Sequence, residues 1–125
     1  MSYKIVGILY DVYNELGSGH REYVYERAIA SEFRKTGIKF AEQIPTALTY
    51  KGEIIGQYRF DFLVEGKIVL ELKQGDRFSR KNFEQVTGYL QSKNLPLGIL
   101  ANFTSSGVVT KRVLNPENIS KLVKD

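Results

Sequence analysis

The hydrophobic period of this chain changes from helical to alternating near residue 44, and that change restricts the fold more than any other feature of the sequence. In the first part the apolar residues recur three and four positions apart, and Gly17 and Gly37 stand where two such helical stripes stop. From residue 44 onward the apolar residues alternate with polar ones, as in a half-buried strand. The sequence therefore predicts a helix that ends at Gly17, a second helix over 22–36, and then a sheet.

The rest of the chain predicts a mixed α/β domain. Lys51-Gly52 and Glu65-Gly66 are turn sequences, Pro45 is typical of an edge strand, and Ser79 is a good helix N-cap. The predicted elements are strands over 44–50, 58–64 and 68–72, a helix after Ser79, strands over 95–103 and 108–114, and a short tail helix after Asn115-Pro116. The order is two helices, three strands, one helix and two strands.

Composition restricts the class of protein. A chain of 125 residues is expected to form one domain over 1–125, and no apolar run approaches the roughly 18 residues of a membrane span. The absence of cysteine excludes disulfides and thiol nucleophiles, and His20 alone cannot form a His-rich metal site. The N-terminal residues do not resemble a signal peptide, so the expected location is the cytoplasm with no membrane partner. The formal charge of +4 modestly favours polyanionic partners.

Charged residues interrupt two of the predicted strands. Alternation places Asp61 on one face of its strand and the apolar residues on the other, and it does the same for Glu71 and Lys73 in the next strand. The faces expected to be apolar carry Phe60, Phe62 and Val64 in the first of these strands and Ile68, Leu70 and Leu72 in the second. The charged residues therefore share the opposite face of the sheet if the strands pair in the right register.

The register depends on the loop between these two strands. A two-residue Glu65-Gly66 loop would put the two apolar sets on different faces of the sheet. A three-residue loop that includes Lys67 aligns them on one face, and we expect this register. The resulting pairs are Val64 with Ile68, Phe62 with Leu70, Phe60 with Leu72, and Asp61 with Glu71.

Two directly opposed carboxylates favour a cation between them. Their Cβ atoms lie about 5 Å apart, and like charges at that separation are destabilising. Hard oxygen ligands suit Mg²⁺, for which Mn²⁺ can substitute, and these ions retain waters and bind substrate phosphates. Lys73, on the same face, can orient an attacking water or neutralise charge on phosphorus. The alternative is a half-exposed sheet face on which Asp61, Glu71 and Lys73 form a salt-bridge ladder.

Glu22 begins a helical stripe that otherwise packs inward. It precedes Tyr25, Ile29 and Phe33 by three, seven and eleven residues, so its carboxylate is expected to need a partner. The alternative is an ordinary first-turn Glu that interacts with the helix dipole.

The helix after Ser79 carries candidate substrate contacts. Gln85 and Tyr89 lie one turn apart, where the amide could bind Lys73 or a phosphate, or could simply be exposed beside a half-buried Tyr. Arg80 and Lys81 open the helix, where backbone N–H groups favour anions, so this turn either binds phosphate or is a solvated charged turn.

Five segments, in this order along the chain, resemble the GxxExxY proteins of the PD-(D/E)XK nuclease superfamily. They are Gly19-His20-Arg21-Glu22-Tyr23-Val24-Tyr25, Arg59-Phe60-Asp61-Phe62-Leu63-Val64, Glu71-Leu72-Lys73, Gln85 through Tyr89, and Leu100-Ala101-Asn102-Phe103. The resemblance extends from the first helix to about residue 112. Phe60 stands where the superfamily name has Pro, and Asn82 stands where relatives often have His.

The resemblance implies a restriction-endonuclease-like fold, with a mixed central sheet flanked by helices. It also implies Mg²⁺-dependent hydrolysis of phosphodiester bonds, with DNA as the expected substrate. Asp61, Glu71 and Glu22 would hold the metal, Lys73 would position or activate water, and Gln85 typifies one branch of the superfamily. A homodimer would enlarge the surface that grips a duplex. The alternatives are a module of the same fold that binds nucleic acid without cleaving it, and a structural domain with a salt-bridge ladder.

Overall fold

A computed structural model describes residues 1–75 and 79–115 of the chain. Its elements are α1 (Ser2–Leu16), α2 (Glu22–Thr36), β1 (Phe40–Tyr50), β2 (Glu53–Val64), β3 (Ile68–Gln74), α3 (Arg80–Lys93), β4 (Leu97–Thr104) and β5 (Gly107–Leu114). The predicted order is confirmed, although β1 begins four residues earlier than the alternation indicated. The tail helix predicted after Asn115-Pro116 lies outside the described residues. Within the described ranges, no helix has the length and hydropathy needed to span a bilayer.

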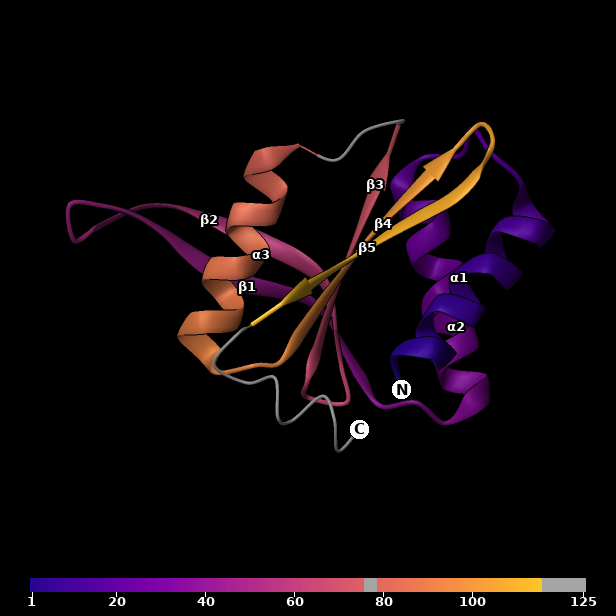
Figure 1. Cartoon of the computed structure of the whole chain (residues 1–125), viewed down its shortest axis with the longest axis horizontal. Helices are drawn as coiled ribbons and strands as arrows, with labels where there is room; N and C mark the ends of the chain where they lie inside the picture. The colour runs from indigo at the N-terminus through magenta and orange to yellow at the C-terminus, as the bar shows by residue number, and fades with distance from the viewer. Residues whose placement is uncertain (76–78, 116–125) are drawn as a thin grey trace.

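The sheet is mixed and follows the chain. Its five strands lie in the order β1-β2-β3-β4-β5, and β1 is an edge strand, as Pro45 predicted. β3 and β4 are parallel and are connected through α3, whereas the other neighbouring strands are antiparallel. Figure 1 shows the twist that results between β1–β2 and the remaining strands.

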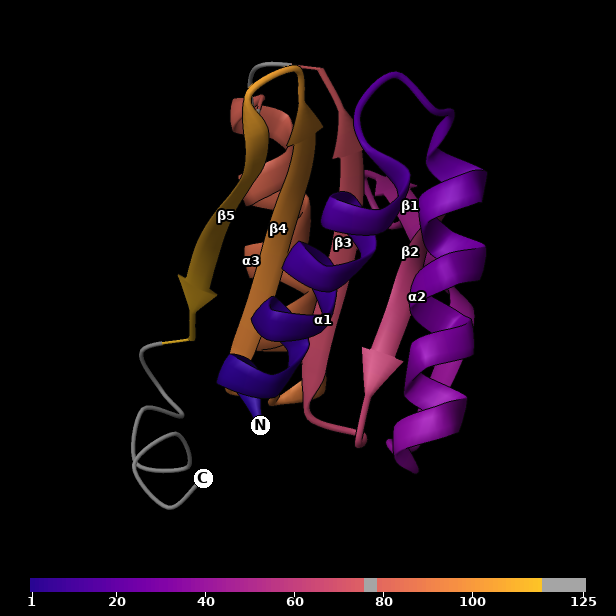
Figure 2. The same cartoon turned by 90° about the vertical axis from the view of Figure 1, so that its right-hand side faces the viewer.

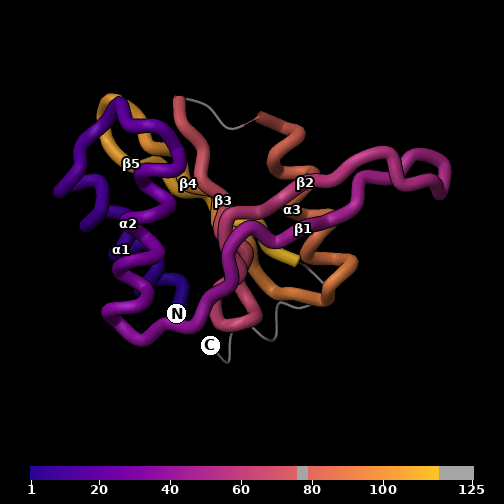
Figure 3. Tube along the Cα trace, turned by 180° about the vertical axis from the view of Figure 1, so that it is seen from behind, coloured from indigo at the N-terminus to yellow at the C-terminus, as the bar shows by residue number. Residues whose placement is uncertain are grey.

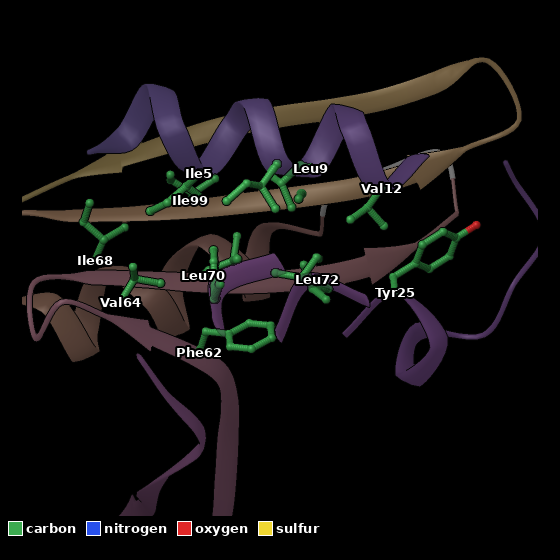
Figure 4. Close-up of a cluster of buried hydrophobic side chains, with 14 of the residues drawn as sticks. Ile5, Leu9, Val12, Tyr25, Phe62, Val64, Ile68, Leu70, Leu72 and Ile99 are labelled. Carbon is green, nitrogen blue, oxygen red and sulfur yellow. The ribbon is translucent and has the colours of Figure 1, made fainter. Parts of the chain in front are cut away.

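The helices lie on both faces of the sheet. α1 and α2 cover one face and α3 the other, as the two views show (Figure 1, Figure 2). The larger apolar cluster lies under α1 and α2, where Ile5 and Leu9 are fully buried with Leu70 and Leu72 (Figure 4). Ile29 of α2 is fully buried in the same cluster. At about 25 cal/mol per Å² of apolar surface, this layer dominates the stability of the domain.

A smaller cluster lies between the sheet and α3. Val86 and Leu90 of α3 pack on Val69 and Leu100 there. A Cβ atom on Gly98 of β4 would collide with a methyl group of Val86. A glycine is therefore what lets α3 approach the sheet this closely.

The β1–β2 ribbon leaves the sheet part-way along its length. β2 pairs with β3 only from Phe62 to Val64, and beyond that the ribbon extends past α3 as a two-stranded arm (Figure 3). We expected Phe60 on the same face as Phe62, and this prediction is wrong. Phe62 packs in the cluster under α1 and α2, whereas Phe60 packs in the cluster under α3. The predicted pairs of Phe60 with Leu72 and of Asp61 with Glu71 do not form, because the β2–β3 ladder ends at Phe62 and Leu70 and the ribbon leaves the sheet at Asp61.

Candidate active site

Asp61 lies where β2 separates from β3. The three-residue loop is confirmed, since Val64 pairs with Ile68 and Phe62 with Leu70. Beyond these pairs, carboxylate side chains accept the hydrogen bonds of backbone N–H groups in place of strand carbonyls. The N–H of Asp61 donates to Oε1 of Glu71 (3.0 Å), and the N–H of Leu72 donates to Oδ2 of Asp61 (2.7 Å). The opening of the sheet therefore brings the two predicted carboxylates together and fixes each to the other strand.

The pairing of β2 with its other neighbour, β1, is also irregular at Asp61. The β1–β2 ladder passes from the Glu42–Phe62 pair to the Ile44–Phe60 pair and omits Gln43, whose φ is 53°. Nε2 of Gln43 donates to both carboxylate oxygens of Glu26 on α2, at 3.0 and 3.2 Å. A left-handed conformation is uncommon for a residue other than glycine, and here a carboxylate of the helix holds it.

Glu71 and Lys73 point toward the α3 side of the sheet, as alternation predicted. Glu71 is only 2% exposed. Its Oε2 accepts a hydrogen bond from the Tyr58 hydroxyl and lies 3.8 Å from Nζ of Lys73. The ammonium of Lys73 also lies 6.0 Å from the centre of the Tyr58 ring. Tyr58 thus contacts both predicted catalytic side chains of β3.

Burial and neighbouring carboxylates raise the pKa values of two acidic groups at the site, Asp61 and Glu26. Burial, the Glu71 carboxylate and, more weakly, Glu22 raise the pKa of Asp61 from 3.8 to about 8, against an opposing hydrogen bond from the Leu72 N–H. Burial and the contact with Glu71 raise the pKa of Tyr58. Burial raises the pKa of Glu26, and Asp61 adds to this while Gln43 opposes it. The site therefore holds more negative charge than its surroundings compensate.

Glu22 is held near the open end of β3. Its Oε1 accepts a hydrogen bond from the N–H of Gln74, at 3.1 Å. From the other side of this strand, Nδ2 of the buried Asn102 donates to the carbonyl of Gly75, at 2.7 Å. The last residues of β3 are thus fixed from α2 and from β4, and Glu22 has the partner that its position predicted.

Tyr25 places the start of α2. Its hydroxyl donates to the carbonyl of Gly17 (2.7 Å) and accepts a hydrogen bond from the N–H of His20 (3.3 Å). Its ring stacks on Phe103 of β4, with centroids 4.0 Å apart. The Tyr that follows Glu22 by three residues therefore anchors the loop and the helix to the sheet. His20 bonds the carbonyl of Leu16, which is a structural role.

The substrate residues predicted on α3 fall into two groups. Gln85 and Tyr89 line a groove of about 270 Å³ between α3 and the β1–β2 ribbon, and Tyr58 lines the same groove. Arg80 and Lys81 are exposed on the first turn of α3, where Arg80 pairs with Glu84 at 3.6 Å. Ser79 caps this helix as predicted, together with Asn82, whose backbone and side chain complete a capping box.

The donor set suits a divalent cation that keeps part of its water shell. Among the described residues, no group of three acidic or imidazole side chains forms a ready-made metal centre. Mg²⁺, however, is commonly bound through one or two carboxylates with water and substrate phosphate as the other ligands. Asp61 and Glu71 provide such a pair, and burial together with the neighbouring Glu71 carboxylate raises the pKa of Asp61.

Sequence reasoning missed three residues near the site. Glu26 lies four residues after Glu22, so the helical period could have indicated it. Gln43 and Tyr58 gave no comparable signal. A polar residue in an edge strand is ordinary, and an alternating Tyr is interpreted as part of an apolar face.

Comparisons with known proteins agree with this architecture. The chain matches the model of the PD-(D/E)XK nuclease superfamily over residues 1–113. No curated protein matches. A crystal structure of a protein called SSO0001 is similar at 16% identity, with a TM-score of 0.54, over 81% of this chain and 53% of that one, so this chain spans about half of its length. An alkaline exonuclease (LHK-Exo) from Laribacter hongkongensis gives a TM-score of 0.48 at 10% identity, over 99% of this chain and 87% of that one.

The mixed sheet with helices on both faces is a restriction-endonuclease-like α/β fold. The family match runs from α1 through almost all of β5, and it includes every residue of the carboxylate site. This chain therefore belongs to the PD-(D/E)XK nuclease superfamily.

Proposed function

We propose that this protein is a Mg²⁺-dependent nuclease of the GxxExxY type that hydrolyses phosphodiester bonds of DNA, with Mn²⁺ able to replace Mg²⁺. The observation that carries the proposal is the pair of linked carboxylates, Asp61 and Glu71, at the open end of the sheet with Lys73 beside them. Membership of a nuclease superfamily supports the reaction class.

Asp61 and Glu71 would hold the metal, with Glu22 assisting from α2. Bound there, a divalent cation supplies a Lewis acid that lowers the pKa of water and neutralises charge on the phosphate. The backbone N–H groups of Asp61 and Leu72 orient the two carboxylates before any ligand arrives, so little reorganisation is needed.

Lys73 would act on the attacking water or on the phosphate. Its side chain is 27% exposed, and it lies between the Glu71 carboxylate and the Tyr58 ring. An ammonium held in this way can donate to a water or to a phosphate oxygen without losing contact with the site. Arg80 and Lys81 would bind the backbone phosphates of DNA, and Gln85 and Tyr89 would contact the substrate near the cut.

Metal binding and cleavage test this proposal together. Calorimetric titration with Mn²⁺ and nicking of a supercoiled plasmid are measured for the native protein, Asp61→Asn, Glu71→Gln and the control Glu32→Gln. Glu32 is a partly exposed carboxylate of α2, away from the site, that pairs with Lys35 at 3.9 Å. We expect the native protein and the control to bind Mn²⁺ and nick DNA, and the two site variants to lose cleavage by roughly 10²–10³-fold.

Two results would point elsewhere. A native protein that neither binds Mn²⁺ nor nicks DNA would leave the charged face of β3 as a salt-bridge ladder. Binding of both Mn²⁺ and DNA, with no nicking in any metal or pH, would indicate a module of the same fold that binds nucleic acid without cleaving it.

A further inference from the structure

The groove between α3 and the β1–β2 ribbon is a distinct feature beside the carboxylate site. We call it the arm groove and define it by Thr46 and Leu48 of β1, Tyr58 and Phe60 of β2, and Gln85 and Tyr89 of α3. It exists because the ribbon turns at Asp61 and runs past α3 instead of continuing in the sheet. Its volume of about 270 Å³ is that of a small-molecule subsite and is far too small for a duplex.

The walls of the arm groove suit a flat, neutral ring. Phe60 packs against Tyr58 and Tyr89, with ring centroids 4.9 and 4.8 Å apart. Phe60 and Tyr89 are almost fully buried in the smaller apolar cluster, so the half-buried Tyr58 is the ring of this aromatic wall that a ligand can reach. The amide of Gln85 and the hydroxyl of Thr46 offer donors and acceptors at the rim.

Charge argues against a phosphate in this groove. Among the described residues that line it, the only charged one is Glu84, and its carboxylate repels an anion. A phosphate is bound instead by cations, main-chain N–H groups or a metal, none of which these walls provide. The occupant that fits is therefore uncharged, aromatic and able to form hydrogen bonds at its edge, which describes a nucleobase.

The arm groove is continuous with the carboxylate site. Phe60 directly precedes Asp61 in β2, and the Tyr58 hydroxyl is hydrogen-bonded to Glu71. A nucleotide whose phosphate lies at the carboxylates therefore has its base within reach of the aromatic wall.

We propose that the arm groove receives one unpaired nucleobase next to the phosphate that is cleaved, so that the preferred substrate is single-stranded or locally unpaired. This inference rests on the proposed function, since it takes the phosphate position from that site. A base inside a duplex is stacked and paired on both sides and can enter such a groove only after it is extruded. An unpaired base enters without that cost and gains stacking on Tyr58, the ring of the groove that is only half-buried.

Gly88 allows the groove to be filled without touching the carboxylates. It lies in α3 on the groove wall, and a Cβ atom placed on it would meet no atom within 4 Å. Gly88→Leu therefore adds a side chain to the groove and also favours the helix. The matched control is Gly7→Leu, at an exposed position of α1 where a Cβ atom likewise meets nothing.

The experiment measures binding separately from cleavage. A short single-stranded oligodeoxynucleotide that carries 2-aminopurine, and the duplex of the same sequence, are titrated with each protein in EDTA, and anisotropy and base fluorescence are recorded. We expect the native protein and Gly7→Leu to bind the single strand more tightly than the duplex. Gly88→Leu should weaken single-strand binding roughly 5- to 150-fold, the range expected for loss of one stacked base, while duplex binding is unchanged.

The outcomes separate this proposal from the nuclease assignment. The proposal of a base groove is overturned if Gly88→Leu binds the single strand as tightly as the native protein does. It is also overturned if Gly88→Leu loses the same affinity for the single strand and for the duplex. Either result counts even if Mn²⁺-dependent nicking is normal. If the protein shows the expected binding pattern but never nicks DNA, the base groove is supported and the proposed nuclease activity is contradicted. If Gly88→Leu instead dissociates a dimer seen by sedimentation and leaves nucleic-acid binding unchanged, the groove is a contact between copies and the proposal is overturned.

Discussion

The two ends of β3 differ in their partners and in their composition. Ile68–Leu70 is paired with β2 on one side and β4 on the other, and all three residues are buried and apolar. Glu71–Gln74 is paired with β4 alone and carries the charged residues of the site. On the open side, carboxylates bind the N–H groups that a neighbouring strand would have occupied. Where the sheet opens, hydrogen bonds from backbone N–H groups thus hold the acidic side chains close together although they repel one another.

The closed end therefore contributes stability and the open end contributes chemistry. Apolar burial stabilises the closed end without regard to pH. The open end concentrates Asp61, Glu71 and Glu22 beside the ammonium of Lys73, and this arrangement costs stability when no cation is bound. The following four predictions test this division.

The largest expected effect contrasts Lys73 with Val69, two residues that point to the same side of β3. Lys73→Ala should lower cleavage by about 10²-fold or more and leave Mn²⁺ affinity near its native value. Val69→Ala should lower the free energy of unfolding by about 2 kcal/mol and leave turnover of the folded protein intact. Nicking assays, calorimetry and urea denaturation measure these quantities. If folded Lys73→Ala kept native cleavage and folded Val69→Ala lost it, the assignment of chemistry to the open end of β3 and of stability to its closed end would be wrong.

The next effect concerns the approach of α3 to the closed part of the sheet. Gly98→Ala should lower the free energy of unfolding by about 1–3 kcal/mol, because its methyl group would collide with Val86. Gly7→Ala, the same change in the exposed interior of α1, should raise it by about 0.5–1 kcal/mol. Urea denaturation of both variants measures the contrast, and equal stabilities would show that α3 is free to move away.

A smaller effect is expected from pH. Because the pKa of Asp61 is raised from 3.8 to about 8, the folded protein retains this proton where the unfolded chain has lost it. The associated stabilisation is complete below the unfolded value and is lost as pH rises through about 8. Asp61→Asn cannot ionise, so in EDTA its melting temperature should exceed that of the native protein by roughly 2 °C or more near pH 9 and by less near pH 5. A difference in melting temperature between Asp61→Asn and the native protein that stays constant from pH 5 to pH 9 would contradict the raised pKa of Asp61.

The smallest effect is expected at Gln43, where the ribbon begins to turn. Gln43→Ala keeps the left-handed backbone and loses the hydrogen bonds to Glu26, which should cost about 1 kcal/mol. Gln43→Gly loses the same bonds but relieves the backbone, so its stability should stay within about 0.5 kcal/mol of native. Thermal denaturation of both variants measures the difference, and a glycine variant less stable than the alanine one would show that the turn depends on the side chain alone.

Much of the fold could be predicted because it depends on local periods. The limits of α2, the N-cap at Ser79 and the three-residue loop before Ile68 all followed from spacing within one element or one turn. Each of these is set by contacts between residues close in the chain or by the two-residue alternation of side chains along a strand. The loop also indicated that Asp61 lies near Glu71, but the predicted strand pair of these two residues is wrong, since β2 and β3 pair only from Phe62 to Val64 and side chains make the contact beyond.

The prediction failed where a strand stopped being regular. Alternation assumes that every residue advances the strand by one step, and the ribbon at Gln43 and Asp61 breaks that assumption. Phe60 consequently lies on the opposite face from the one expected. The contacts of Tyr58 with Glu71 and of Glu26 with Gln43 join residues 13 and 17 positions apart, and no period connects such residues.

The order of the elements, the register of the β2–β3 turn and the grouping of Glu71 with Lys73 were determined by the amino-acid sequence alone, because apolar periods specify which face of each element must be buried. The point at which the sheet opens, the arm groove and the surplus charge around Asp61 were decided only in three dimensions. They depend on which backbone groups lose a strand partner, and that is a property of the assembled sheet.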